Sequence, residues 1–274
     1  MRFDWYQPTV AENPLILVDE LSRRLAPGGK VEEGRGRHNY WQSFTICDRA
    51  GDRVAMILCG GPNGDPNVTA SGPACDAFVP IVRELWPDHR VTRADVAEDM
   101  QGEGVYEALE GVCRATAGKH GVMGLAFVPD DPADGRTYTM GSRASDVTAR
   151  LYDKTAELRR HLPPERHAEV PDNVARLEVA VRPRKVWRDL ASKMPPEQFW
   201  GMSGWTAALA AEALALQVDR VTMQGGRETN HDRAVRFMLA QYGPTLWRMY
   251  EDHGDWQAVG LQLGYELSKL RRVH

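Results

Sequence analysis

A single tyrosine between two cations is the part of this sequence best suited to chemistry on a phosphate. Between residues 137 and 157 the chain reads TYTMGSRASDVTARLYDKTAE. If residues 147–154 form a strand, the period of two places Arg150, Tyr152 and Lys154 on one face and apolar residues on the other. A phenol normally titrates near about 10, so it needs positive neighbours or a metal ion to attack at neutral pH. An ordinary strand tyrosine explains the same pattern.

Two further segments each place an arginine and a carboxylate two residues apart. They are VTRADVAED, with Arg93 and Asp95, and NVARLEVAVR, with Arg176 and Glu178. Residues two apart on a strand share a face, and a carboxylate beside a cation stays ionised. Such carboxylates suit Mg²⁺ or Mn²⁺, which take oxygen ligands from protein, water and substrate phosphate. Salt bridging on a solvated sheet face is the alternative interpretation.

Other chemistries find little support in the sequence. None of the eight histidines forms a His-x-His pair, which argues against a histidine-bound metal. The glycine-rich stretch 60–66 is not followed by Gly-Lys-Ser/Thr, so a P-loop is excluded, and no Ser-centred hydrolase elbow occurs. The four cysteines lack metal-ligand spacing and are expected to be buried free thiols. With no apolar run near about 20 residues and no secretory signal, a cytoplasmic protein is predicted.

The positioning elements are short strands followed by helices. The pattern predicts an α+β domain on an antiparallel sheet over residues 1–190, with flanking helices, and a helical region over 191–274. The first strand, residues 2–10, is expected to place Phe3, Trp5 and Gln7 on one side, and residues 30–38 are expected to form a polar loop. Residues 250–270 are compatible with either a helix-turn-helix or a dimer-forming hairpin.

The charge balance is mildly acidic overall but basic around the tyrosine. The formal net charge is −4. Between residues 143 and 193, however, 12 Lys and Arg stand against 8 Asp and Glu. A protein that grips nucleic acid usually shows a local basic surface, although charge runs are commonly just solvated faces.

The order of the motifs resembles one known family. The segments RFDWYQPTV, TASGPACDAF, VTRADVAED, TYTMGSRASDVTARLYDKTAE, ARLEVAVR and HDRAVRFMLAQYGPTL follow one another along the chain. This order is similar to that of the replication initiation factors of rolling-circle plasmids and related phages, the Rep_trans type. The resemblance covers most of the chain, and the Gly-Ser-Arg to Arg-Leu-Tyr-Asp-Lys run is its most specific part.

The resemblance implies a nicking and joining enzyme, with residues 1–190 as its catalytic domain. Tyr152 matches the nucleophile that attacks one DNA strand, keeps the 5′-phosphate and releases a 3′-hydroxyl primer before the strand is rejoined. Asp95 and Glu178 match the acidic positions that hold a divalent cation, Mg²⁺ or Mn²⁺. Asp99 and Glu157 are lesser candidates for the metal or for proton handling. Beside the tyrosine, Lys154 and Arg150 would screen the charge that builds up in the transition state.

DNA contacts are expected from basic residues, namely Arg143, Arg150, Arg176, Arg182, Arg184 and Lys185. The expected partners are origin DNA, a second copy of the chain in a homodimer, and the host helicase and polymerase. Two alternatives stay open: a DNA-binding initiator or regulator without catalysis, and a mobilisation relaxase with the same chemistry.

Overall fold

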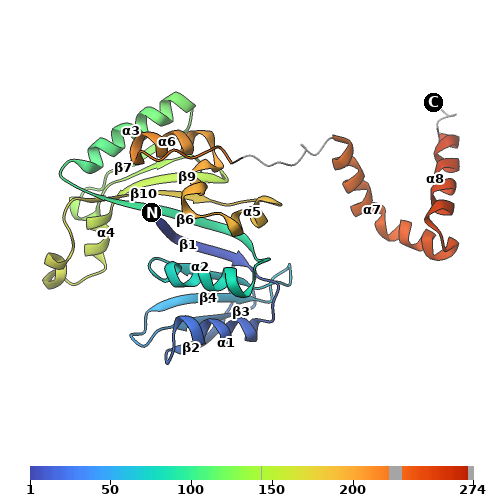
Figure 1. Ribbon diagram of the computed structural model, residues 1–274, viewed down its shortest axis with the longest axis horizontal. Helices are drawn as coiled ribbons and strands as arrows, with labels where there is room; N and C mark the ends of the chain where they lie inside the picture. Colours follow the sequence, from blue (N-terminus) through green and yellow to red (C-terminus); the bar gives the residue numbers. More distant parts are fainter. Residues whose placement is uncertain (143, 222–229, 271–274) are drawn as a thin grey trace. The chain divides into compact units, whose positions relative to one another are not determined.

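The structure is a computed structural model that describes residues 1–142, 144–221 and 230–270. The chain divides by compactness into two units, Met1–Val221 and Thr222–His274. The functional division at residue 190 stays a prediction, and the helices that immediately follow that residue belong to the first unit (Figure 1).

One antiparallel sheet runs through the first unit. Its ten strands lie in the order β2-β3-β4-β5-β1-β6-β10-β9-β8-β7 (Figure 1). The strand bounds are β1 Arg2–Thr9, β2 Lys30–Arg35, β3 Gln42–Cys47, β4 Arg53–Cys59, β5 Asn67–Ser71, β6 Arg90–Gln101, β7 Gly124–Phe127, β8 Thr137–Met140, β9 Val147–Asp153 and β10 Val174–Val181. The predicted α+β class with an antiparallel sheet is confirmed.

Helices pack against one face of this sheet. The helices of the first unit are α1 Pro14–Leu25, α2 Ala74–Leu85, α3 Val105–His120, α4 Lys154–Arg160, α5 Trp187–Lys193 and α6 Gly204–Leu214, with 3₁₀ turns at Pro132–Asp134, Pro164–Glu169 and Pro196–Met202. Helices α1, α2, α3, α5 and α6 all contribute to one apolar core, and the strands contribute side chains such as Tyr6, Ile57, Leu151 and Leu177. Because antiparallel strands alternate, the opposite face is left to polar side chains.

Two predictions about the N-terminal strands were wrong. The pairing of β1 with β6 shifts register between Phe3 and Trp5. Phe3 and Tyr6 are therefore buried in the core, and the side chain of Trp5 does not lie on the same face of the sheet as that of Phe3. A bulge of this kind inserts an extra residue and breaks the simple alternation. The expected loop at residues 30–38 contains the exposed edge strand β2, which is held by backbone pairing to β3 and not by burial.

The second unit is a pair of helices, α7 Asn230–His253 and α8 Trp256–Leu270. Gly254, with φ of 70°, allows the tight turn between them. Around this turn, Trp247, Tyr250 and Trp256 form an aromatic cluster with ring centroids 4.8–5.6 Å apart. Among the described residues, none of the helices combines the length and apolar character needed to cross a membrane. Whether the pair binds DNA or forms a dimer stays a prediction.

Candidate functional site

The register of three central strands gathers the predicted site residues on the open face. Tyr152 of β9 lies opposite Arg176 of β10, and Arg176 lies opposite Asp99 of β6. One pair further along, Glu178 lies opposite Arg150. Directly opposed residues of neighbouring strands project to the same side of a sheet. Arg176, Glu178, Asp99 and Arg150 line one hollow of about 520 Å³ together with Asp95, Lys154 and Glu157. Tyr152 lines a neighbouring hollow, which shares Arg150 and Glu157 with the first.

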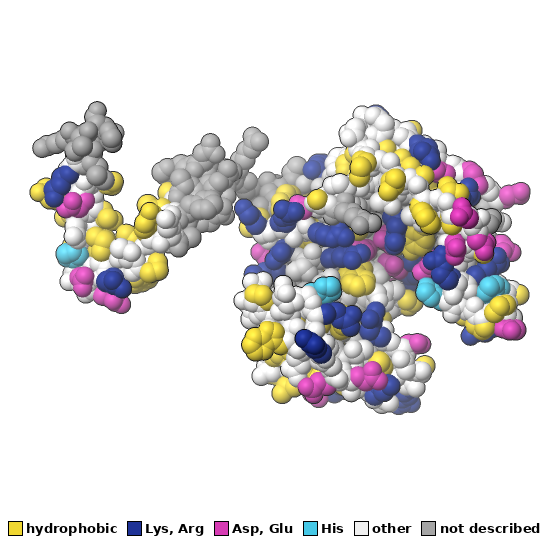
Figure 2. All heavy atoms as spheres, turned by 180° about the vertical axis from the view of Figure 1, so that it is seen from behind, with side chains coloured by type: hydrophobic (Ala, Val, Ile, Leu, Met, Phe, Trp, Pro, Cys, Tyr) yellow, Lys and Arg dark blue, Asp and Glu magenta, His cyan; other side chains and the backbone are white. Residues whose placement is uncertain are grey.

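The side of the first unit away from its helices is strongly charged. Figure 2 shows Lys and Arg side chains gathered across it, with Asp and Glu side chains between them. On a mixed surface of this kind, the cations can bind phosphates while the neighbouring carboxylates remain available to bind a metal ion.

Tyr152 occupies the face that the sequence predicted. Val147, Ala149 and Leu151 belong to the core side, while the ring of Tyr152 lies beneath the guanidinium of Arg150, whose Cζ is 4.5 Å from the ring centroid. The strand ends at Asp153, one residue earlier than predicted, and Lys154 begins α4 with its Nζ 5.9 Å from the same centroid. The predicted arrangement of one tyrosine between two cations is therefore present.

The phenol of Tyr152 is not activated by this arrangement. Burial raises the pKa of Tyr152 above that of an exposed phenol, and the negative charge of Glu178 raises it further. The charges of Arg176 and Arg150 oppose these two effects only in part. Any attack by this oxygen therefore requires that the charge of Glu178 be neutralised or that a further positive charge be brought close to the phenol.

Asp95 and Glu178 are buried carboxylates on adjacent strands. Arg93 donates two hydrogen bonds to Asp95, at 2.9 and 2.5 Å, and Arg150 donates longer ones of 3.3 and 3.4 Å to Glu178. Burial nevertheless raises the pKa of Asp95 above its ordinary value, against the effect of Arg93. Burial also raises the pKa of Glu178 to about 7; the charge of Arg150 lowers it, and that of Asp95 adds to the increase. Burial thus makes the ionised form of both carboxyls unfavourable, although each has an arginine beside it.

Arg176 organises the floor of the site. It donates to both carboxylate oxygens of Asp99, at 2.5 and 2.7 Å, and through its remaining nitrogen to Asp4 at 2.7 Å. Although burial raises the pKa of Asp99, the bonds from Arg176 outweigh burial and hold that pKa below its usual value. The side chain of Arg176 is 3 % exposed, so its guanidinium serves these two acids. Its predicted contact with DNA stays a prediction.

Asp4 was missed by sequence reasoning. It lies at the bulge of β1, between Phe3 in the core and Trp5 on the other side. Its position next to an aromatic residue in an N-terminal strand gave no sign that it would bind an arginine 172 residues away. Only the pairing of β1 with β6 and of β6 with β10 could reveal this contact.

The lesser candidates and the remaining basic residues lie around this centre. Glu157 forms an ion pair with Lys154 one helical turn away, and α4 is capped by Asp153, which accepts a hydrogen bond from the backbone of Ala156. Further along, Arg184 pairs with Asp146 at 2.7 Å, and Lys185 is exposed. Arg182, directly after β10, is half-buried and its charge lowers the pKa of Asp95. Arg143 lies outside the described residues.

The donor set fits a divalent cation in one specific way. Within residues 1–142, 144–221 and 230–270, no group of three or more His, Cys, Asp or Glu side chains is arranged to hold a metal ion. Magnesium, however, is commonly bound by one or two carboxylates together with waters and substrate phosphates. The two buried carboxylates match that mode and would form its protein part.

The fold therefore defines an α+β protein whose sheet has one helix-covered face and one open, charged face. Its structure is similar to that of the rolling circle replication initiator protein from Geobacillus stearothermophilus, with a TM-score of 0.51 and 14% sequence identity. The alignment covers 80% of this chain and 98% of that chain. The resemblance predicted from the sequence is thus confirmed at the level of the fold.

Comparison of the sequence of this chain, in contrast, gave no match. No protein-family model matches it, and no curated protein is similar enough in sequence to match.

Proposed function

We propose that this protein initiates rolling-circle replication by nicking one DNA strand at an origin and later rejoining it. The observation that carries the proposal is that the neighbouring strands β6, β10 and β9 bring Asp95, Glu178 and Tyr152 to the open face. There Arg150 lines both the hollow of the two carboxylates and the neighbouring hollow of Tyr152. The similarity in fold to a rolling circle replication initiator supports the same conclusion.

The reaction is a transesterification at one phosphodiester. The phenolic oxygen of Tyr152 bonds to phosphorus, the bond from phosphorus to the 3′ oxygen breaks, and the phenolic proton ends on that 3′ oxygen. The product retains the phosphodiester energy in the protein–DNA link, so the strand can be resealed without a nucleotide cofactor. The released 3′-hydroxyl serves as the primer.

The chain's own residues position the phosphate and balance charge. Arg150 covers the ring of Tyr152 and is half-exposed, so it can contact a phosphate oxygen while holding the ring in place. Lys154 lies close to the same ring. Arg176 fixes Asp99 and Asp4 and thereby keeps the face rigid around the reacting groups.

Asp95 and Glu178 would hold the divalent cation, Mg²⁺ or Mn²⁺. When bound, such a cation supplies a positive charge that polarises the scissile phosphate. Neutralising Glu178 also removes one of the three effects that raise the pKa of Tyr152, the others being burial and the charge of Asp4. The acidic pair thus makes nicking depend on the cation.

Denaturing gels of the protein incubated with Mn²⁺ and the DNA that flanks its gene test the proposal. A covalent protein–DNA adduct is expected with the wild type and not with Tyr152→Phe. Tyr138→Phe is the matched control, because Tyr138 lies on the adjacent strand β8 but is buried in the core on the other face. An adduct that survives Tyr152→Phe would move the nucleophile elsewhere.

The buried phenol favours a second candidate, a DNA-binding initiator or regulator without catalysis. The pKa of Tyr152 is raised, which is unsuited to attack unless the site changes on binding. Specific DNA binding with no adduct under any cation condition would establish this second function.

A further inference from the structure

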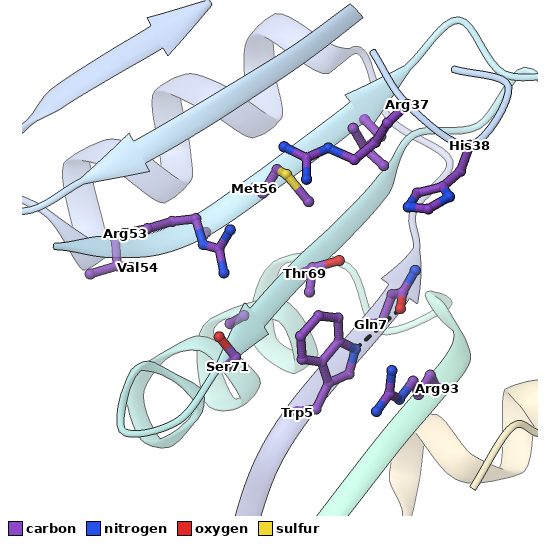
Figure 3. A pocket seen from close by; sticks show the side chains of 13 residues that line it. Trp5, Gln7, Arg37, His38, Arg53, Val54, Met56, Thr69, Ser71 and Arg93 are labelled. Atoms are coloured by element: carbon purple, nitrogen blue, oxygen red, sulfur yellow. Dashed lines mark hydrogen bonds between the residues drawn. The ribbon is translucent and has the colours of Figure 1, made fainter. Parts of the chain in front are cut away.

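A second hollow lies on the same face, beyond the acidic pair. It is lined by residues of β1, β4, β5 and β6 and by residues 37–38, and its volume is about 390 Å³ (Figure 3). We call it the Trp5 pocket. In Figure 3 the side chains of Trp5, Arg37, Arg53 and Arg93 surround one open space.

The pocket carries cations that the protein does not neutralise. Its lining includes three arginines and no aspartate or glutamate. Arg93 is held by Asp95, but no ion pair within the described residues engages Arg37 or Arg53, and both are exposed. Most other arginines of the first unit that the structure describes are paired, so two free guanidiniums at one hollow indicate an anionic ligand.

Trp5 is fixed in an orientation suited to stacking. Its indole nitrogen donates a hydrogen bond of 3.1 Å to Gln7, which in turn donates to Asn67 at 2.7 Å. The guanidinium of Arg93 lies 4.8 Å from the indole centroid. A half-buried indole held in this way offers a rigid aromatic surface next to cations, the combination on which nucleic-acid bases stack.

The backbone of the overhanging turn is specially shaped. His38 and Asn39 are consecutive residues with positive φ, 54° and 68°. A Cβ at Gly36 would lie 2.1 Å from the carbonyl oxygen of Tyr40, so only glycine fits there. Left-handed conformations of non-glycine residues cost free energy and cluster at ligand-binding sites. Here they hold Arg37 and His38 over the pocket.

The Trp5 pocket is continuous with the candidate active site. Trp5, Ser71 and Arg93 line both this pocket and the hollow that contains Asp95 and Glu178. From β9, which carries Tyr152, to β1, which carries Trp5, is three strand spacings, or about 14 Å. That distance corresponds to about four nucleotides at the stacked spacing of about 3.4 Å.

We propose that the Trp5 pocket binds a nucleotide of the same single DNA strand that Tyr152 cuts, about four nucleotides from the scissile phosphate. Trp5 stacks on the base, and Arg37 and Arg53 bind the adjoining phosphate. This inference rests on the proposed function for the identity of the strand. A free nucleotide offers the same base and phosphate, so the test separates the two sources.

The test measures binding of fluorescein-labelled oligothymidylates to the full chain carrying Tyr152→Phe, by fluorescence anisotropy. Trp5→Leu and Arg37→Ala/Arg53→Ala are each expected to weaken binding at least about fivefold, whereas Trp5→Phe retains most of it. Affinity is expected to rise with strand length until the strand spans both hollows.

The matched control is Arg23→Ala/Arg49→Ala, which removes two exposed arginines close to α1, on the helix side of the sheet. This control should bind like the parent, and thermal unfolding verifies that every variant is folded. Equal binding by the pocket variants and the parent would overturn the inference. Displacement of the oligonucleotide by thymidine monophosphate as effectively as by unlabelled oligothymidylate would also overturn it, in favour of a free-nucleotide site.

The outcome is separable from that of the adduct assay. Adduct formation by the wild type, with no effect of the pocket variants on binding, would refute the Trp5 pocket alone. Weakened binding by those variants in a protein that never forms an adduct would refute the nicking function and leave the pocket.

Discussion

The raised pKa of Glu178 leads to a prediction that does not depend on activity. Burial raises the pKa of this carboxyl to about 7 from an ordinary 4.5. Because the folded-state pKa is raised, the stability linked to this group is fully present below about pH 4.5 and is lost as the pH rises through about 7. At about 1.4 kcal/mol per unit, ionised Glu178 costs the folded state about 3 kcal/mol above pH 8.

Glu178→Gln keeps the shape of the side chain and removes the charge. The variant is therefore expected to be more stable than the wild type at pH 8, by up to about 3 kcal/mol, and to lose this advantage at pH 5. For a unit of this size the difference corresponds to roughly 6–12 °C in the unfolding temperature. Denaturant unfolding at several pH values between 5 and 8 measures the free energies directly.

The cation provides a second measurement on the same variant. Adding Mn²⁺ at pH 8 is expected to stabilise the wild type, by about 2.7 kcal/mol at one hundred times its dissociation constant, and not Glu178→Gln. Glu110→Gln is the control, because that carboxylate belongs to α3 and pairs with Arg114, away from the acidic pair. Unfolding free energies of wild type and Glu178→Gln that run parallel from pH 5 to 8 would refute the reasoning.

Four further predictions concern other parts of the chain. Burial lowers the pKa of His89, whose imidazole is hydrogen-bonded to the hydroxyl of Tyr6 at 2.8 Å. Because the unfolded chain then binds the proton more readily, the free energy of unfolding of the wild type should fall below about pH 6.5. Urea unfolding should show a smaller decrease in His89→Gln. Asp4→Ala leaves buried Arg176 with one partner and should cost about 1.5–3 kcal/mol by the same assay. The affinity for oligothymidylate should fall with salt, and removing both free arginines of the Trp5 pocket should reduce the logarithmic slope by about 1.4. Finally, Leu261→Glu, at an exposed apolar position of α8, should turn the expected homodimer into a monomer in light scattering; a wild type that is monomeric throughout would contradict this.

The sequence specified the central strands well because their chemistry alternates. In β9 the apolar positions are buried and Tyr152 projects to the other side, as a period of two requires. The same rule correctly separated Leu177 and Val179 from Arg176 and Glu178 in β10. Fold class and the faces of Tyr152, Arg176 and Glu178 therefore followed from local pattern.

Tertiary structure alone decided which residues meet. The register of β6 and β10 pairs Arg176 with Asp99 of the neighbouring strand, and not with Glu178, two residues further along its own strand. This ion pair depends on long-range strand pairing. The bulge in β1 moves Asp4 and Trp5 away from the predicted alternation, because one extra residue reverses the direction of every side chain that follows. The two unpaired arginines of the Trp5 pocket come from the turn before β3 and from the first residue of β4, which no local sequence pattern connects. Sequence thus determined the chemistry that the chain carries, and the pairing of distant strands determined where that chemistry is concentrated.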